Sequence, residues 1–360
     1  MPQNNSDQGI ISRAKIVKGI KLFIALTAIG ILIVLYRSSI SESFSSLRDF
    51  KLPQLALIVF LVLFDWFMAG LRIHLFASHV HPGISFGGCI RANLANVFMG
   101  GVTPSQTGGG AGQIYILYKE GMGFMDATVV SFLGFLNTVV FLPVSGLLIT
   151  FLLKSRIENV ALRMFSMTTI LAFSMILIAV VVSLIDPKLF ESCVRSLLRI
   201  IPFLNRVVKS KAYHKFLETL TRYHILMLHF IKNGKLIIAI GFFLTIIMYF
   251  NKFAIAYVVL SGLGIQVDFW QVIYLQLLLI LVFYFSPTPG SSGFAELSSA
   301  LIMGQIIPKS SVGIFVLLWR FFTLFLGMLI GAYVLLRYML KNDRVEATAK
   351  ADFDVKTTTK

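Results

Sequence analysis

Charged residues and cysteines are scarce in this chain, and each scarcity excludes a class of protein. Asp, Glu, Lys and Arg make up 13% of the 360 residues, whereas a soluble domain holds about 25%. Hydrophobic residues make up 57%, and the mean hydropathy of +0.85 indicates an integral membrane protein. The two cysteines, Cys89 and Cys193, lie far apart, so neither a disulfide framework nor a cysteine metal site is expected.

Acidic residues are also few, 16 against 32 Lys and Arg, which gives a formal net charge of +16. In a membrane protein such an excess marks cytoplasmic loops and contact with anionic lipids. No basic patch with interleaved aromatic residues occurs in a soluble segment, so no nucleic-acid partner is expected.

Long apolar runs predict the fold. Six are long enough to cross a bilayer as helices: about 20–36, 53–77, 124–152, 160–185, 235–260 and 312–338. Two shorter runs lead into loops rich in Gly and Pro, and a short apolar piece follows each loop; the runs are about 86–100 and 270–286, and the pieces are 114–118 and 294–307. We therefore predict an all-α, polytopic transmembrane helical bundle with about six full spans and two broken or re-entrant helix pairs. Eight full spans are the alternative.

The basic residues predict the orientation. They concentrate before the first run, between about 186 and 235, and after residue 340. Six spans with two non-crossing hairpins place all three regions on the cytoplasmic side of the cell inner membrane. The first broken pair then enters from the cytoplasm and the second from outside, so the two units are inverted repeats, as in many transporters. The first run lacks a cleavage site, so we expect it to be retained as a span.

The expected organisation has a cytoplasmic N-terminal segment (1–18), a transmembrane domain (19–340) and a cytoplasmic tail (341–360). Within the domain, repeat one covers about 53–152, a linker covers about 186–234, and repeat two covers about 235–338. The linker alternates apolar and basic residues. Amphipathic helices on the anionic leaflet and a solvated connection are equally compatible with that pattern.

The two loops, GGVTPSQTGGGAGQ (100–113) and FSPTPGSSGFAEL (285–297), are the candidate site. Their prolines end the incoming helices, and their glycines permit positive φ and close approach. Their hydroxyl side chains can cap helix starts. A half-helix after each loop would direct N–H groups and a positive dipole end toward an anion such as a lipid headgroup. Ordinary interhelical turns are the alternative. The candidate residues from the loops are Thr103, Pro104, Gly108, Gly109, Gly110, Gly112, Gln113, Thr288, Pro289, Gly290, Gly293 and Glu296.

Charged residues inside spans are costly and usually face a cavity or a partner. Arg72 lies seven residues after Asp65, on the same helix face, and Arg320 lies deep in the last span with Glu296 as its expected partner. We predict that all three belong to the substrate site: Arg72 and Arg320 attract the phosphate, and Glu296 orients Arg320 or takes part in proton coupling. A structural ion pair, or a long side chain that reaches the interface, is the alternative for each. Lys252 and Asp126 are expected to be structural or interfacial.

No catalytic apparatus is visible. His74, His79 and His81 lack a nearby carboxylate motif, so we expect interfacial histidines and no metal site. The HExxH, GxSxG and P-loop patterns are absent. We therefore expect no cofactor and no catalytic residue, and predict that the chain is not an enzyme.

The segments VTPSQTGGGAGQIYILYKEGM and FSPTPGSSGFAEL resemble the two signature segments of the lysylphosphatidylglycerol synthase transmembrane region, a flippase-like membrane family, over about residues 15–340. The resemblance implies transfer of a phospholipid or lipid-linked anionic substrate between leaflets. Lipid-modifying members carry a cytosolic aminoacyl-transferring domain, which we do not expect here. The family often has Gly-Glu where this chain has Gly112-Gln113, which argues against carboxylate-based coupling at the first loop.

Two other functions stay open at this stage. One is an intramembrane lipid-headgroup enzyme that uses Glu296 with Asp126. The other is a non-transporting membrane partner of a separate synthetase or glycosyltransferase. The expected partners are membrane lipids, anionic or phosphate-bearing, with a separate lipid-modifying enzyme as a further option.

Overall fold

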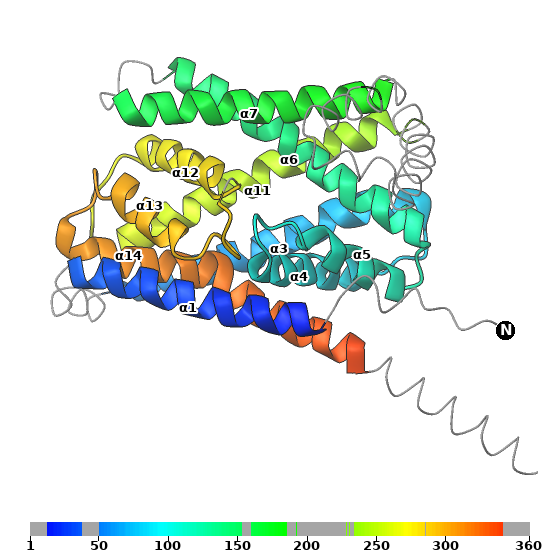
Figure 1. Ribbon diagram of the computed structural model, residues 1–360, viewed down its shortest axis with the longest axis horizontal. Helices are drawn as coiled ribbons and strands as arrows, with labels where there is room; N and C mark the ends of the chain where they lie inside the picture. The colour runs from blue at the N-terminus through cyan, green and yellow to red at the C-terminus, as the bar shows by residue number, and fades with distance from the viewer. Residues whose placement is uncertain are drawn as a thin grey trace, which may run out of the picture. The chain divides into compact units, whose positions relative to one another are not determined.

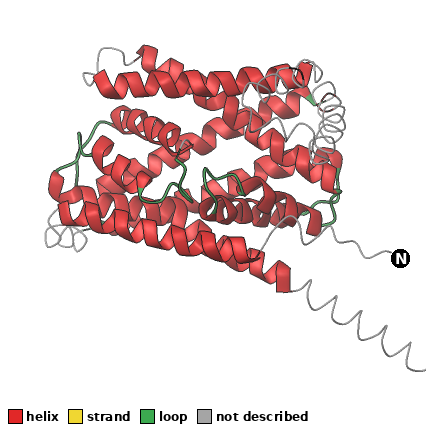
Figure 2. Ribbon diagram, viewed as in Figure 1, coloured by secondary structure: helices red, strands yellow, loops and turns green. Residues whose placement is uncertain are grey.

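The computed structural model describes residues 13–37, 50–152, 160–185, 234–284 and 286–340, and the single positions 192, 228 and 230. These residues form ten α-helices and one π-helical turn, with no β-strand among them (Figures 1 and 2). The predicted all-α class is therefore confirmed. Cys193, residues 1–12, most of the predicted linker and the tail from 341 lie outside the described residues.

The long helices coincide with the predicted spans. They are α1 (Arg13–Arg37), α3 (Leu52–Val80), α6 (Phe124–Leu152), α7 (Val160–Ile185), α11 (Lys235–Gly262) and a last helix that begins as α14 (Lys309–Arg320). The last helix passes through a π-helical turn, η3 (Phe321–Phe325), and continues over residues 326–340. Five stretches of the described chain are long and apolar enough to cross a membrane: Ile16–Tyr36, Leu52–Val80, Phe124–Leu147, Lys235–Gly262 and Lys309–Leu340. Whether α7 also crosses remains a prediction.

Both predicted broken helix pairs are present. The first consists of α4 (Phe86–Val102, 17 residues) and α5 (Gly109–Lys119, 11 residues). The second consists of α12 (Phe269–Tyr284, 16 residues) and α13 (Phe294–Met303, 10 residues). At about 1.5 Å per residue, each short arm is about half as long as the ~30 Å hydrocarbon core. Each pair therefore has one long and one short arm, joined by an irregular loop.

The chain divides into two compact units. One is built from residues up to 127 and from 248 onward, and the other from residues 128–247. The first unit holds α1, α3, both broken pairs and the last helix, and thus every residue predicted for the site. The second holds α7 and most of α6, which runs through Pro143 without ending. The domain boundaries drawn from the sequence remain predictions.

The last helix contacts the first broken pair beyond its π-helical turn. The side chain of Met328 packs onto Gly101. A Cβ atom on Gly327 would lie 3.2 Å from Val97, and one on Gly331 would lie 2.9 Å from the Cβ of Phe98. Small residues thus let this helix lie close to α4, as is common where helices pack within membranes.

Candidate functional site

The loops of the two broken pairs touch at their tips. Pro104 and Pro289 form an antiparallel backbone bridge, and the Ser105 hydroxyl donates to the Ser286 carbonyl at 3.1 Å. Figure 2 shows the two loops facing each other between their helices. Two broken pairs that meet tip to tip are the arrangement that inverted repeats would produce. We refer to this contact, residues 103–108 with 286–293, as the tip junction.

The backbone of the tip junction is strained. Ser105, Gln106 and Ser291 have φ of +50°, +56° and +58°, and Gly290 and Gly293 have φ of +55° and +75°. Each non-glycine residue in this region costs about 1–2 kcal/mol. Such strain clusters at functional sites, where the surrounding structure maintains it.

The first loop corrects one prediction about its glycines. Gly108 has φ of −79°, and none of the glycines from 108 to 112 has a positive φ, so these glycines do not supply that conformation. They allow close approach instead. A Cβ atom on Gly109 would lie 2.9 Å from Asn96 Oδ1, and one on Gly112 would lie 2.7 Å from the Ala95 carbonyl. The group that approaches is helix α4 of the same pair.

Polar side chains hold the first loop together. Thr103 Oγ1 donates to the Met99 carbonyl at 2.7 Å and accepts from the N–H of Gly108, the residue before α5, at 2.8 Å. It thus ties the loop to the end of α4, but the start of α5 has no side-chain cap, contrary to the prediction. Gln113 is buried, and its Oε1 accepts from Asn96 Nδ2 at 3.0 Å. Both predicted residues are therefore engaged within the first pair.

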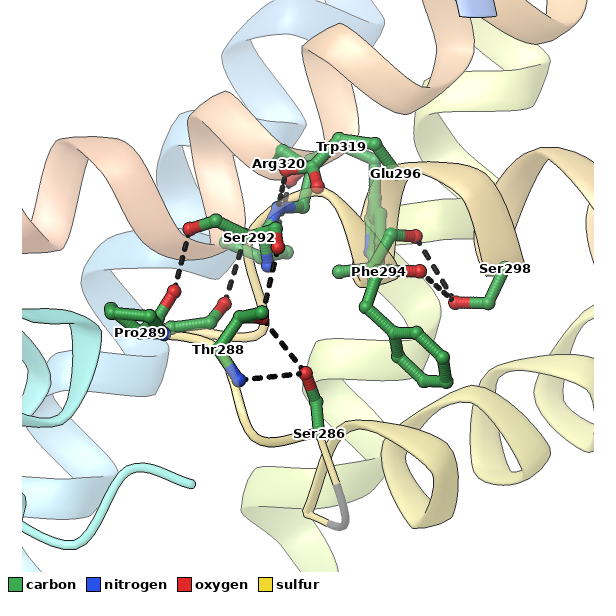
Figure 3. Close-up of polar contacts among 12 residues, drawn as sticks. Ser286, Thr288, Pro289, Ser292, Phe294, Glu296, Ser298, Trp319 and Arg320 are labelled. Carbon is green, nitrogen blue, oxygen red and sulfur yellow. Dashed lines mark hydrogen bonds and ion pairs between the residues drawn. The ribbon is translucent and has the colours of Figure 1, made fainter. Parts of the chain in front are cut away.

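In the second loop two hydroxyl groups bind the loop's own carbonyls (Figure 3), and a third binds a carbonyl near the end of α12. Thr288 Oγ1 donates to the Ser292 carbonyl at 2.9 Å, and Ser292 Oγ donates to the Pro289 carbonyl at 2.6 Å. Ser291 Oγ donates to the Phe283 carbonyl at 2.8 Å. No side chain caps the first turn of α13, whose N-cap is Gly293. The predicted capping by these serines is therefore wrong for α13.

A buried ion pair lies beside the tip junction (Figure 3). Arg320 Nε donates to Glu296 Oε1 at 3.0 Å, and Arg320 Nη2 donates to the Gly290 carbonyl at 3.0 Å. The side chains are 5% and 0% exposed for Arg320 and Glu296. The pairing predicted from the sequence is confirmed. The guanidinium thus joins the last helix to both the loop and the short arm of the second pair.

Several polar atoms close to this pair in the sequence or structure are buried without a hydrogen-bond partner among the described residues. They are Glu296 Oε2, Ser299 Oγ, Trp319 Nε1 and Thr27 Oγ1. Buried polar groups are normally satisfied, and exceptions mark bound water, an ion or a functional group. The region around Glu296 therefore holds several such atoms; others lie elsewhere, among them Gln54 Oε1 and Asp65 Oδ1.

Arg320 is also the last residue before the π-helical turn η3. Single π-helical turns inside α-helices are rare and are frequent at functional sites. The ring of Phe325, the last residue of that turn, lies 5.5 Å from the guanidinium carbon of Arg320. The irregular turn therefore supplies an aromatic face to the buried cation.

Helix α1 covers the pair, which the sequence did not predict. A Cβ atom on Gly30 would lie 3.0 Å from Gly293 Cα and 3.4 Å from Glu296 Oε2. About two turns earlier on α1, the ring of Phe23 meets the ring of Phe325 edge-on, with centroids 5.9 Å apart. The available signal was Gly30 itself, the one glycine within the predicted span 20–36.

Arg72 belongs to a different polar group from Arg320. It interacts electrostatically with Asp65 and with the hydroxyls of Tyr249 and Tyr284, which lie 3.1 Å apart. Asp65 Oδ2 also lies 3.7 Å from Lys252 Nζ, so Lys252 forms an ion pair with Asp65 that the sequence analysis did not name. Tyr284 precedes the second loop, so Arg72 lies on the side of that loop where α12 ends.

A hydrogen-bond network that the sequence analysis missed joins the first broken pair to the last helix. It lies at the end of the pair opposite its loop, where α4 begins and α5 ends. Arg91 Nη2 lies 2.7 Å from Glu120 Oε1, Tyr338 donates to the same oxygen, and Ser85 Oγ donates to Glu120 Oε2 at 3.3 Å. Partial burial raises the pKa of Glu120, but the hydrogen bonds from Tyr338 and Arg91 outweigh it and hold that pKa below its ordinary value. Tyr338 is 218 residues from Glu120, so no local pattern could reveal the contact.

The histidines and Asp126 take no part in the tip junction. The ring of His74 packs against Phe86, and its Nδ1 lies 3.9 Å from Cys89 Sγ. Within the described part of the chain, no group of three His, Cys, Asp or Glu side chains could hold a metal ion. Asp126 lies in the first turn of α6, where a carboxylate complements the helix dipole.

Comparison with known proteins gives two matches. The family model for the lysylphosphatidylglycerol synthase TM region matches residues 20–331. A UPF0104 membrane protein of Archaeoglobus fulgidus is 26% identical over 275 residues, which cover 74% of this chain and 81% of that protein. Together with the helices of span length, these matches support a multi-pass membrane protein of lipid metabolism or transport.

Proposed function

Because this chain belongs to the family of the lysylphosphatidylglycerol synthase transmembrane region, we propose that it moves a phospholipid or lipid-linked anionic substrate between the two leaflets. The tip junction, with the buried Glu296–Arg320 pair beside it, is the observation that carries this proposal. Irregular backbone at membrane depth is tolerated only inside protein or beside a watery cavity. Two such loops in contact form a centre around which a carrier can open to alternate sides.

Arg320 would bind the phosphate of the substrate. Its guanidinium presents several N–H donors in a fixed plane that matches phosphate oxygens. In the described conformation those donors bind Glu296 and the Gly290 carbonyl, and the group is buried. Opening of the junction would exchange these two acceptors for phosphate oxygens. The residues of both loops predicted as substrate-binding would then line the path of the headgroup.

Arg72 would act as a second attractive charge. It lies where α3, α11 and α12 meet, close to the start of the second loop. We propose that the protein resides in the cell inner membrane with both termini in the cytoplasm, so that each broken pair enters from one side. Reporter fusions at residue 1 and after residue 360 test this orientation, and activity of an external reporter at either end would contradict it.

The test of transport is a leaflet-exchange assay with purified protein in liposomes that contain labelled anionic phospholipids. We expect exchange above that of empty liposomes with the wild-type chain. We expect it to be lost in Arg320→Ala and reduced in Pro289→Ala. Lys309→Ala removes an exposed cation from the same helix and serves as the matched control, which should retain exchange.

A folded wild-type protein that shows no exchange over a broad panel of anionic lipids would refute the proposal. Co-purification of a lipid-modifying enzyme with such an inactive chain would instead favour the role of a membrane partner. Conversion of the lipid headgroup, lost in Glu296→Gln with binding retained, would favour an enzyme.

A further inference from the structure

We propose, building on the proposed function, that Glu296 is a proton-binding site and that a lipid phosphate reaches Arg320 together with one proton. The proton would occupy the Glu296 carboxylate when the phosphate replaces it as the partner of Arg320. Movement of the anionic lipid would therefore be coupled to movement of protons in the same direction.

Charge balance in the buried site leads to this inference. In the described conformation one carboxylate, Glu296, faces one guanidinium, Arg320, so the pair is neutral overall. A phosphodiester brings one further negative charge. If Glu296 stayed ionised, the closed site would hold an uncompensated charge beside a carboxylate that is 0% exposed, which is strongly unfavourable. If Glu296 takes up a proton, the guanidinium and the phosphate balance each other and the site stays neutral.

Among the residues that the structure describes, Arg320 is the charged side chain bound to Glu296. The elements packed on α13 are α1, α12 and α14. From α14, Arg320 faces the carboxylate; from α1, Gly30 approaches it. The other titratable side chains described on these elements are the exposed Lys18, Lys21, Tyr36 and Lys309, the buried Tyr274 and the partly buried Tyr284.

The orphaned oxygen of Glu296 provides a place for the proton. Oε1 accepts from Arg320, whereas Oε2 is buried and accepts from no described residue. Ser299 lies one turn further on α13, and Thr27 lies one turn before Gly30 on α1; both have buried hydroxyls without a partner among the described residues. Such hydroxyls can both donate and accept.

The atoms and charges of the exchange balance. A hydronium proton from the bulk solution binds Glu296 Oε2 and gives a neutral carboxylic acid, which no longer attracts the guanidinium as an ion. Arg320 keeps its own proton and its positive charge, because its deprotonation is unfavourable throughout the working pH range. The phosphate oxygens accept the N–H donors that Glu296 Oε1 and the Gly290 carbonyl had accepted. Release of the lipid reverses the exchange, and the proton leaves.

The test measures proton uptake when purified protein binds a soluble short-chain phosphatidylglycerol in weakly buffered detergent solution. A pH-indicator dye reports protons, and radiolabelled lipid reports binding independently. We expect about one proton per bound lipid and, by linkage, an affinity that rises up to about tenfold per unit fall in pH. Glu296→Gln should bind lipid without taking up protons and without this pH dependence. Glu120→Gln, which alters another glutamate paired with an arginine, should behave as wild type.

Each outcome separates the two proposals. Wild-type binding without proton uptake would overturn the proton site and leave translocation standing. Proton uptake that persists in Glu296→Gln would overturn the assignment to Glu296. Uptake caused equally by inorganic phosphate would assign the site to a soluble anion and overturn the lipid assignment. Failure of the wild-type protein both to bind and to exchange anionic lipids would refute the proposed function itself.

Discussion

The buried Glu296–Arg320 pair should reveal itself in a double-mutant cycle. In Arg320→Met, the Glu296 carboxylate is left buried without a cation, and in Glu296→Leu, the guanidinium is left without a carboxylate. Removal of one partner of a buried pair typically costs about 3–5 kcal/mol, because the remaining charge is uncompensated. Replacement of both partners by apolar side chains of similar size is often close to neutral.

One further contact changes the stability expected of the double variant. Arg320 also donates to the Gly290 carbonyl, so any variant that removes the guanidinium leaves this carbonyl without its donor. An unsatisfied buried group costs about 1–3 kcal/mol. We therefore expect the double variant Glu296→Leu/Arg320→Met to be less stable than wild type by about that amount. Each single variant should lose about 3–5 kcal/mol, so the cycle should yield a coupling energy of several kcal/mol.

Unfolding by SDS in mixed micelles measures these free energies, with helix content followed by circular dichroism. Asp65 and Lys252 provide the comparison pair in the same unit, since their atoms are 3.7 Å apart and Lys252 is 38% exposed. The coupling energy of the comparison pair should be clearly smaller. If the losses of the two single variants simply add in the double variant, Glu296 and Arg320 do not depend on each other and the reasoning above is refuted.

Three further predictions follow from the geometry of the same unit. Gly293→Ala should destabilise the protein by about 1–2 kcal/mol in SDS unfolding, because φ is +75° while the nearest atom to the new Cβ lies at an ordinary 3.4 Å; a neutral effect would show that the loop relaxes freely. Gly30→Leu should press α1 away from Gly293, lower stability by about 1–3 kcal/mol and expose a cysteine placed at Ser299 to thiol reagents, and unchanged labelling would contradict the covering role of α1. The pKa of Glu120 is lower in the folded state than in the unfolded chain, where it is about 4.3. The stability that Glu120 contributes should therefore be complete at pH values above the unfolded pKa and should disappear as pH falls through the folded-state pKa. Thermal melts at several pH values should show this loss in wild type and a weaker loss in Tyr338→Phe.

The sequence predicted those parts of the fold that depend on local composition. The apolar runs located the long helices, and the Pro and Gly clusters located both interruptions, because a break at membrane depth requires these residues. The partner of Arg320 was also predictable, since a charge in the middle of a span needs a counter-charge and Glu296 was the nearest available one.

The parts that failed depend on tertiary contacts. Positive φ was expected from the glycines of the first loop, yet Ser105 and Gln106 adopt it, because Gly109 and Gly112 are required where α5 lies against α4. The packing of α5 against α4 thus outweighed the preference of glycine for positive φ. The bonds of Tyr338 to Glu120 join residues that are distant in sequence, and such contacts leave no periodic pattern.

The last helix touches both broken pairs, one on each side of its π-helical turn. Before the turn, Arg320 is bonded to the second pair, and after it, Met328 packs on the first. Both broken pairs are therefore attached to the same helix. For the loop tips to separate, the last helix must bend or one of the pairs must detach from it. The π-helical turn at Phe321–Phe325 already interrupts the regular α-helical hydrogen bonds, so the helix bends there at the lowest energetic cost.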